Sequence, residues 1–467
     1  MKLRSRFLWV AVIACLLTPI YVSAEDAALT DSEKTRMAGE LISGVMNLLL
    51  ERFIGEDISP ENLYESALRG MMDSLDPYSQ YLSTDELNEL QKSFSGKMYG
   101  IGISFNISEK NTPIIGKVLA DSPAAKSGLA KGDILLEVNG REVKGLPLDD
   151  IFAIIDESDI VTFKIQRGVE TFEKSIEKQI IEVPTVTLEP FEDKIDAAKT
   201  RDNTELRYMA ISEFGEETAQ EFIDAIDKLR EEGVKRIAID LRGNPGGYAD
   251  SVIKICKHIV PKGPILFTIN KKGEETLIYS ELEDIPFEKI VVLTDHGTAS
   301  AAEVLVSALQ DAKAATVIGE TTYGKGVIQS LYPLPVGGAL KFTTEEYLRR
   351  SGEKINNIGV VPDITVEVPG FITDPVELDE NSASDTLPAI RKALSYLGYE
   401  FDSVDNENIY DNSLKDAVRH FQSDEGIEVN GNLDTDTLVQ LNVAVYKSYG
   451  EIDRALEQAY ETLREGL

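Results

Sequence analysis

The stretch Lys289–Ala312, KIVVLTDHGTASAAEVLVSALQDA, predicts a strand, a turn and a long helix in direct succession. The upstream stretch RIAIDLRGNPGG, residues 236–247, predicts a second strand that ends in a tight glycine loop. Strand and helix patterns alternate in this way from Thr185 to Pro369. Such alternation is typical of an α/β core, so this region is expected to form the main domain of the chain.

Ser300 stands where the turn of the first stretch passes into its helix. The start of a helix offers free N–H groups and the positive end of the helix dipole. A serine there can attack a carbonyl group while the N–H of Ala301 stabilises the oxyanion. The glycines of NPGG, Gly246 and Gly247, are candidates for the second donor. Taken alone, Ser300 is more commonly an ordinary helix N-cap.

Lys325 lies in GETTYGKGVIQS, residues 319–330, which begins like a phosphate-binding P-loop. A P-loop continues with Ser or Thr as a Mg²⁺ ligand, and here Gly326 takes that place. Lys325 is then either a surface charge or a partner for Ser300. Lys325 and Gln329 share one face of a straight strand but lie about 13 Å apart along it. A bend near Gly326, or a lysine that reaches along the strand, must close that gap.

The first 24 residues predict an export signal. Basic residues are followed by the apolar run Phe7–Val22 and by the small-residue cleavage sequence Val22-Ser23-Ala24. The apolar run is short for a membrane span of about 20 residues, although an uncleaved anchor is the alternative. An exported protein meets little ATP, which also argues against a P-loop.

Composition narrows the classes of partner and cofactor. The 467 residues suffice for about three domains. The net charge of −34 argues against nucleic acid and anionic lipid as partners. Cys256 would be the one cysteine of the exported chain, and its apolar surroundings predict a buried residue. No pair of His, Cys or carboxylate residues has convincing metal-ligand spacing, so neither a metal nor a cofactor is expected.

Residues 25–95 predict a helical region, in which Thr30–Phe53 is a helix with a Thr30/Glu33 capping box. Residues 96–184 then change to short strands and glycine turns, such as YGIGISF and SPAAKSGLAKGDILLEVNG. This β-sandwich or barrel pattern resembles a PDZ domain. The resemblance implies that a peptide carboxylate binds at a loop next to a strand edge. The residues of that loop are Tyr99, Gly100, Ile101 and Gly102.

After a linker at 371–384, residues 385–446 resemble a small three-helix peptidoglycan-binding domain. The matching positions are mostly core positions, which specify the fold better than the ligand. They are Ala389, Leu394, Leu397, Gly398, Tyr399, Ala417, Val418, Phe421, Gln422, Gly431, Thr437 and Leu441. Residues 447–467 predict a last helix with Ile452, Leu456, Tyr460 and Leu463 on one face.

The motifs GTASAAE, GETTYGKGVIQ and IGVVPDI together resemble those of the carboxyl-terminal processing proteases. These are serine peptidases with a PDZ domain and a Ser–Lys active site. The resemblance covers roughly residues 70–369, including DPYSQYL at 76–82. It implies a crotonase-like α/β core over residues 185–370. Two positions depart from the family pattern, since Asp295 stands for an Asn and Thr298 for a Ser.

The resemblance also implies roles for individual residues. Ser300 would be the nucleophile, Lys325 the general base and Gln329 the residue that orients the lysine. The oxyanion hole would consist of Gly246, Gly247 and Ala301.

The expected function is that of an exported, ATP-independent endopeptidase. Its substrates would be polypeptides recognised by C-terminal or unstructured ends, and its last domain would bind peptidoglycan. Related proteases dimerise through terminal helical regions, so a homodimer is expected through the helices at 30–53 and 450–467.

Three alternatives remain at this stage. A silent adaptor would bind peptides and wall material, but the complete Ser–Lys–Gln set argues against it. An acyl-CoA enzyme with a similar core conflicts with export and the PDZ domain. A Ser-His-Asp triad through His296 would need the turn before Ser300 to fold back on itself. His258 and His420 fit helix patterns as structural residues, and Asp311 lies about 16 Å from Ser300 along the helix axis.

Overall fold

The computed structural model describes residues 30–55, 58–108, 111–191, 206–366, 369–373, 378, 381–402, 406–451 and 453–465. The predicted export signal at 1–24 lies outside these ranges. Within them, no helix is long and apolar enough to cross a membrane. The chain divides into two compact units, residues 1–81 and 82–467.

The first unit contains two helices, α2 (Asp31–Arg52) and α3 (Pro60–Asp73), and the short strand β1 (Gln80–Leu82) crosses its boundary. The predicted capping box of α2 is confirmed, since the N–H of Thr30 donates to Glu33 Oε2 over 2.8 Å. No residue of α2 is buried in this structure. Its apolar side chains nevertheless recur at helical spacing, at Met37, Leu41, Val45 and Leu48.

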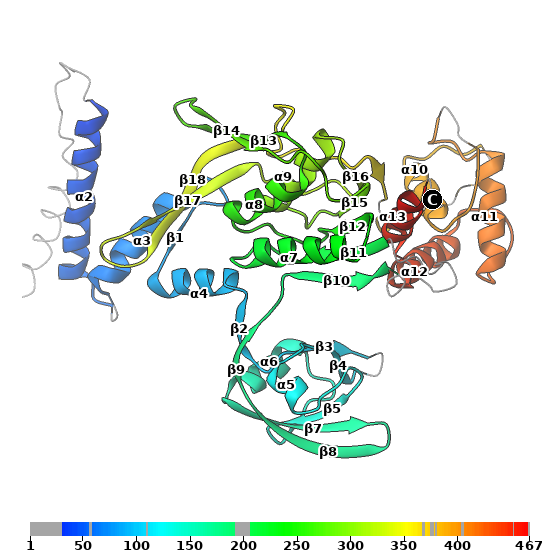
Figure 1. Cartoon of the computed structure of the whole chain (residues 1–467), viewed down its shortest axis with the longest axis horizontal. Coiled ribbons are helices and arrows are strands. Elements are labelled where there is room, and N and C mark those ends of the chain that lie inside the picture. Colours follow the sequence, from blue (N-terminus) through cyan, green and yellow to red (C-terminus); the bar gives the residue numbers. More distant parts are fainter. Residues whose placement is uncertain are drawn as a thin grey trace, which may run out of the picture. The chain divides into compact units, whose positions relative to one another are not determined.

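The second unit begins with a helix and the PDZ region, drawn in blue and cyan in Figure 1. A two-stranded ribbon of β2 and β9 leads into a sheet of order β3-β4-β5-β7-β8, in which β6 pairs with β5. The bounds are α4 (Thr84–Phe94), β2 (Lys97–Gly100), β3 (Ile103–Ile107), β4 (Pro113–Val118), α5 (Pro123–Lys126), β5 (Ile134–Val138), β6 (Arg141–Glu142), α6 (Leu148–Asp156), β7 (Ile160–Arg167), β8 (Glu170–Glu177) and β9 (Gln179–Glu182).

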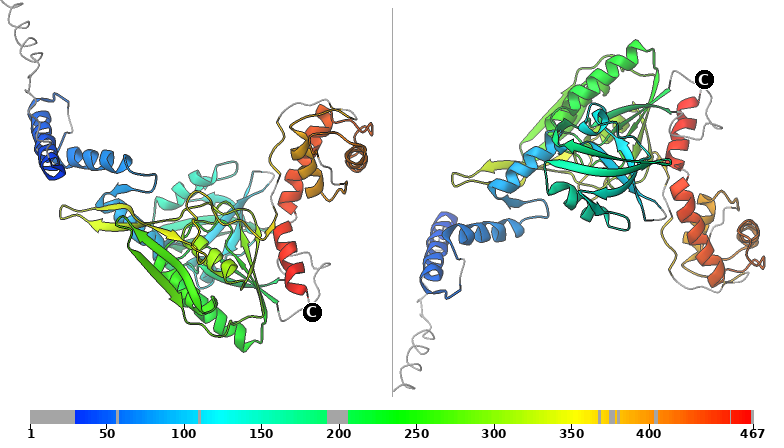
Figure 2. Two further views of the ribbon diagram at one scale, coloured as in Figure 1. Left: turned by 90° about the horizontal axis from the view of Figure 1, so that it is seen from above. Right: turned by 90° about the horizontal axis from the view of Figure 1, so that it is seen from below.

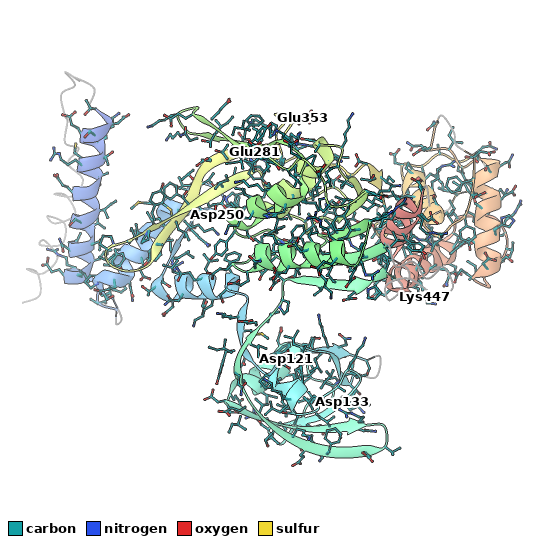
Figure 3. All side chains as sticks on the ribbon, in the orientation of Figure 1. Asp121, Asp133, Asp250, Glu281, Glu353 and Lys447 are labelled. Atoms are coloured by element: carbon teal, nitrogen blue, oxygen red, sulfur yellow. The ribbon has the colours of Figure 1, made fainter. Side chains whose placement is uncertain are left out.

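A buried carboxylate stabilises the PDZ sheet. Asp133, labelled in Figure 3, is 1% exposed. It accepts hydrogen bonds from the guanidinium of Arg167 at 2.6 and 2.7 Å and from the N–H of Ala130 at 2.9 Å. This bidentate ion pair joins the start of β5 to the end of β7. Charge-assisted hydrogen bonds of this kind are stronger and more directional than neutral ones.

The α/β core is built on a six-stranded sheet of order β10-β11-β12-β15-β16-β19 (Figure 1). β10 is antiparallel to β11, and the remaining neighbours are parallel. A second, antiparallel sheet contains β17, β18, β13 and β14 in that order. The bounds of the strands in both sheets are β10 (Val186–Pro190), β11 (Leu206–Ile211), β12 (Arg236–Asp240), β13 (Gly263–Asn270), β14 (Glu275–Ser280), β15 (Lys289–Thr294), β16 (Thr316–Gly319), β17 (Val327–Pro333), β18 (Ala339–Leu348) and β19 (Ile364–Thr365).

Helices cover both faces of the six-stranded sheet, because side chains along a strand alternate between its faces. In β15, Ile290 and Val292 belong to the cluster with α7 (Thr218–Glu231), α8 (Ala249–Ile259) and α9 (Ala301–Asp311). Val291 and Leu293 face the opposite way and pack with α13 (Arg454–Arg464). The α/β core predicted from the sequence is therefore confirmed.

Helix α8 confirms the predicted burial of a cysteine and has an acidic residue at its start. Cys256 is completely buried, as expected, and burial raises the pKa of its thiol. Asp250, labelled in Figure 3, lies in the first turn of the helix. A negative charge there is favoured by the helix dipole.

The last helix does not present a free apolar face, which corrects the expectation that it contributes to a dimer contact. Leu456, Tyr460 and Leu463 are 2%, 4% and 0% exposed because they pack on the protease sheet. Figure 2 shows this helix in red, beside the strands of the core. Its terminal carbonyl groups also accept hydrogen bonds from Arg236 and Lys289, and cations at this end of a helix are favourable.

Three helices form the C-terminal domain, as predicted: α10 (Leu387–Tyr396), α11 (Asn412–Asp424) and α12 (Thr435–Glu451). The buried side chain of Gln422 accepts from the N–H of Gly431 at 2.8 Å and donates to Thr437 Oγ1 at 3.0 Å. These matched positions thus form one polar network. Ala389 differs from the expectation, since it is exposed.

The protease core is consequently discontinuous in sequence. The chain leaves the core after β19, forms the three-helix domain, and returns with α13. Val366 before the domain and Asp453 after it line the same cavity of about 580 Å³. The three-helix domain is thus an insertion into the protease and not a tail.

Candidate active site

Ser300 occupies the junction between β15 and α9, where the sequence placed it. Its backbone has φ 54° and ψ −117°, the mirror image of an ordinary extended residue. A side chain in such a region costs of order 1–3 kcal/mol, and strain of this kind gathers at active sites. The conformation corresponds to the sharp strand-to-helix turn that exposes the nucleophile of many hydrolases.

The two departures from the family pattern both serve this turn. The Oδ1 atom of Asp295 accepts from the N–H of Gly243 at 2.8 Å and of Gly297 at 2.9 Å. The hydroxyl of Thr298 donates to the carbonyl of Leu241 at 2.9 Å. An Asn oxygen and a Ser hydroxyl can make these same bonds, so the exchanges preserve the loop.

The buried carboxylate of Glu303 joins the serine turn to the lysine loop. Glu303 is 0% exposed in the first turn of α9. Its Oε2 atom accepts from the N–H of Ser300 and from the N–H of Lys325, each at 2.8 Å. Its Oε1 atom accepts from the N–H of Gly324 at 2.7 Å and from the hydroxyl of Thr322 at 2.5 Å. One carboxylate therefore brings the two candidate catalytic residues together.

Lys325 precedes β17 and is half-buried between two glycines. A Cβ on Gly326 would lie 2.4 Å from the nitrogen of Asn356, and one on Gly324 would lie 2.9 Å from the nitrogen of Gly359. Real Cβ atoms do not come this close to backbone. The glycines therefore allow the chain at 356–359 to pack on the lysine loop.

The glycine loop after β12 approaches the serine from another side. A Cβ on Gly246 would lie 2.8 Å from Ser300 Cβ and 2.9 Å from the nitrogen of Ala301. The N–H of Gly246 donates to the side-chain oxygen of Asn244 at 2.8 Å. Of the predicted oxyanion donors, Gly246 already has an acceptor within the protein. Gly246 thus packs on the serine turn itself, whereas Gly247 packs on the backbone of Phe214.

Gln329 lies on β17, opposite Thr343 of β18. Its Nε2 atom donates to Thr343 Oγ1 at 3.3 Å and to the carbonyl of Val327 at 3.4 Å. The pairing of β17 with β18 shifts between Ile328 and Gln329. Such a bulge bends a strand locally. A bend is one of the two ways in which the separation of about 13 Å between Lys325 and Gln329 on a straight strand could be reduced. The role of Gln329 in orienting Lys325 stays a prediction.

The histidine alternative receives no support from the geometry. The side chain of His296 is 75% exposed, and its Nε2 atom lies 3.6 Å from Glu320 Oε2. His258 is exposed as well, with Nδ1 at 2.8 Å from the carbonyl of Lys254. Asp311 pairs with Arg349 at the far end of α9. His296, His258 and Asp311 thus have other partners, and none of these contacts supports a Ser-His-Asp triad at Ser300.

The predicted carboxylate loop of the PDZ domain joins β2 to β3. Tyr99 and Gly100 belong to β2, and the Tyr99 hydroxyl donates to Asp159 at 3.0 Å. Ile101 is buried. Gly102 has φ +82°, and a Cβ there would lie 2.4 Å from Ser122 Cβ, so only glycine fits.

Sequence reasoning missed Glu303, although a signal was present. The four residues Ser300–Glu303 fit the S-x-x-E capping box, and the acidic residue interrupts an otherwise apolar helix. A carboxylate at such a position needs hydrogen-bond donors when it is buried. The identity of those donors in the lysine loop was not visible from the sequence.

Comparisons with known proteins agree with this architecture. Peptidase family S41 matches residues 205–366, the PDZ domain matches residues 89–166, and the putative peptidoglycan binding domain matches residues 384–441. Among solved structures, the photosystem II D1 C-terminal processing protease is 27% identical and has a TM-score of 0.43. The match covers 69% of this chain and 87% of that chain.

Two curated relatives extend over nearly the whole sequence. The carboxy-terminal processing protease CtpA of Bacillus subtilis (strain 168) is 31% identical over 97% of this chain and 96% of its own. CtpB of the same strain is 30% identical over 93% and 91%. The fold, the serine turn and these matches together define a serine peptidase. The chain belongs to the carboxy-terminal processing proteases of peptidase family S41.

Replacement of Glu303 by Gln tests the carboxylate bridge. An amide presents an NH₂ group on one side, so at least one buried N–H of the two loops would face a donor. Each buried donor left without an acceptor costs about 1–3 kcal/mol. We expect a lower thermal unfolding midpoint and loss of peptide cleavage in Glu303→Gln. Glu346→Gln removes a surface pair with Lys354, which is worth about 0–1 kcal/mol. Equal behaviour of the two variants would contradict the bridge.

Proposed function

We propose that this chain is an exported serine endopeptidase in which Ser300 is the nucleophile and Lys325 the general base. The observation that carries the proposal is the Glu303 Oε2 atom, which lies 2.8 Å from the backbone nitrogen of both residues. Ser300, in a strained conformation at the start of a helix, and the half-buried Lys325 are therefore bound by the same carboxylate oxygen. The proposal uses no metal or cofactor.

In the acylation step, the neutral amine of Lys325 takes the proton of the Ser300 hydroxyl as its oxygen attacks the scissile carbonyl carbon. The carbonyl oxygen becomes an oxyanion, which the N–H groups of Gly247 and Ala301 stabilise. The Lys325 ammonium then gives its proton to the departing amine. The peptide bond breaks, and the acyl group stays on Ser300 as an ester. Water, deprotonated by Lys325, releases the acyl group in the second half of the reaction.

This chemistry requires a lysine that is neutral before the attack. Free lysine has a pKa of about 10.4 and is protonated at neutral pH, but removal from water lowers it. Lys325 is half-buried, so part of the residue is removed from water. Gln329 uses its amide nitrogen toward Thr343, which leaves its carbonyl oxygen to orient the lysine.

The substrates that fit this architecture are polypeptides with C-terminal or unstructured ends. In the PDZ domain, β3 forms one edge of the sheet and directly follows the glycine loop at 99–102. An extended peptide can add to such an edge, while N–H groups of a glycine loop bind its terminal carboxylate.

Cleavage of an unfolded test protein distinguishes this mechanism from its rivals. We expect Ser300→Ala and Lys325→Ala each to abolish cleavage without loss of the fold, and the wild-type rate to rise with pH as Lys325 loses its proton. EDTA should leave the rate unchanged. His296→Ala is the matched control, because an exposed histidine should be dispensable. Normal cleavage by Lys325→Ala, or loss of cleavage in His296→Ala, would refute the Ser–Lys assignment.

The inserted three-helix domain is proposed to bind peptidoglycan, supported by the family match at 384–441. Its loops are acidic, and cell walls often carry anionic polymers. Contacts would therefore be hydrogen bonds and apolar packing, which salt screens little.

Because the three-helix domain is inserted before α13, it must be removed without removing α13 when peptidoglycan binding is tested. We expect a variant in which residues 370–451 are replaced by a short Gly/Ser linker to cleave soluble peptide normally. It should no longer sediment with purified peptidoglycan, whereas the full chain should do so even at high salt. A variant ending at Gly370 also removes α13, uncovers the sheet face and should lose stability. Equal sedimentation of the full chain and the linker variant would rule out the tether.

We also propose a homodimer that forms through helix α2 alone, because the apolar face of the C-terminal helix is already buried. Leu41 and Val45 are 68% and 46% exposed within its apolar stripe. A second copy of the stripe would cover these side chains, and burial of apolar surface favours association.

Light scattering of the exported chain measures this association. We expect the dimer mass for the wild type and the monomer mass for Leu41→Glu/Val45→Glu. The control Ser43→Glu/Asn47→Glu adds the same charge to the opposite side of the helix and should stay dimeric. A wild-type monomer at micromolar concentration would refute the dimer.

A further inference from the structure

One tyrosine hydroxyl lies between the serine turn and the lysine loop. Tyr347 is near the end of β18 and is 3% exposed. Its hydroxyl oxygen is 2.9 Å from the carbonyl oxygen of Ser300 and 2.6 Å from the carbonyl oxygen of Lys325. Both partners are acceptors, so the single hydroxyl proton is shared between them.

The backbone holds this side chain in place. The N–H of Tyr347 donates to the carbonyl of Gly326 at 3.0 Å, directly after Lys325. Tyr347 also pairs with Thr268 of β13, so both neighbours of the strand fix its position. The hydroxyl therefore reaches the two carbonyl groups from a rigid sheet, as a positioning group should.

Tyr347 and Glu303 bind the same two residues, Ser300 and Lys325, through different backbone groups. Glu303 accepts from the N–H groups of Ser300 and Lys325. Tyr347 donates to the carbonyl groups of the same two residues. The backbone of the nucleophile and that of the base are thus bridged twice, once by an acceptor from α9 and once by a donor from β18.

We propose that Tyr347 is a positioning residue for the Ser–Lys reaction, which sets the distance between the nucleophile and the base without contacting the substrate. The inference rests on the proposed function of Ser300 and Lys325. Because the carbonyl of Ser300 also accepts from the N–H of Val304 at 3.2 Å, α9 holds the serine without the tyrosine. The effect of the hydroxyl therefore falls mainly on the lysine loop.

The test compares Tyr347→Phe with Tyr332→Phe. The first variant removes the bridging oxygen and keeps the ring. The second removes the hydroxyl of a tyrosine that is 48% exposed on β17 and keeps its stacking on Phe342. For Tyr347→Phe we expect kcat to fall about tenfold to a hundredfold, the loss that a small misplacement of a catalytic group causes. KM should change little, and the rising limb of the pH–rate profile should move to higher pH as Lys325 gains water. Tyr332→Phe should match the wild type in all three.

A merely structural role predicts a different result. It would lower the amount of active enzyme, measured by titration with a fluorophosphonate that labels the serine, but not kcat per active site or the pH profile. If Tyr347→Phe folds poorly, kcat per titrated site is measured on the monodisperse fraction at low temperature. An unchanged kcat and pH profile there overturns the inference. A wild-type protein that cleaves nothing would instead overturn the proposed function.

Discussion

The arrangement of the site depends on one buried carboxylate. Glu303 carries its charge in the first turn of α9, where backbone N–H groups and the helix dipole stabilise it. Three of the four donors to this carboxylate are backbone N–H groups, and the fourth is the hydroxyl of Thr322, so the lysine loop lies close against the start of the helix. On its other side, the glycines that flank Lys325 allow the backbone of Asn356 and Gly359 to pack on the same loop. The buried carboxylate of Glu303 needs several hydrogen-bond donors, and these donors come from the serine turn and the lysine loop. The carboxylate therefore determines where these two segments meet.

The proposed nucleophile is held in a backbone conformation that a residue with a side chain disfavours. Ser300 has a positive φ, and the neighbouring Gly246 comes so close that a Cβ would overlap Ser300 Cβ. Strain of this kind persists only where the surroundings over-determine the backbone. Here the N–H of Ser300 is bound by Glu303, and its carbonyl by Val304 and Tyr347. Three elements of the core, α9, β18 and the glycine loop after β12, therefore converge on this turn and fix its backbone.

The protease core is completed by α13, a helix that follows the three-helix domain in the sequence. The six-stranded sheet is buried on both faces only when α13 returns to cover Val291 and Leu293. Parallel strands that are apolar on both faces need such a cover on each side. The inserted domain is joined at both ends to residues around one cavity, lined by Val366 and Asp453. Two attachments restrict such a domain more than a single linker would.

The sequence determined the local elements and the serine peptidase family. The strand–turn–helix at 289–312, the capping box of α2, the α/β core and the position of Ser300 at a helix start all follow from periodicity and short-range bonding. The tertiary structure alone decided which distant groups meet. No pattern in the sequence pairs Glu303 with the N–H of Lys325, or Tyr347 with two carbonyl groups, because hydrogen bonds to backbone carry no residue-type signal. The face covered by α13 was also hidden, since an amphipathic helix shows that it needs a partner but not whether that partner is its own sheet or another chain.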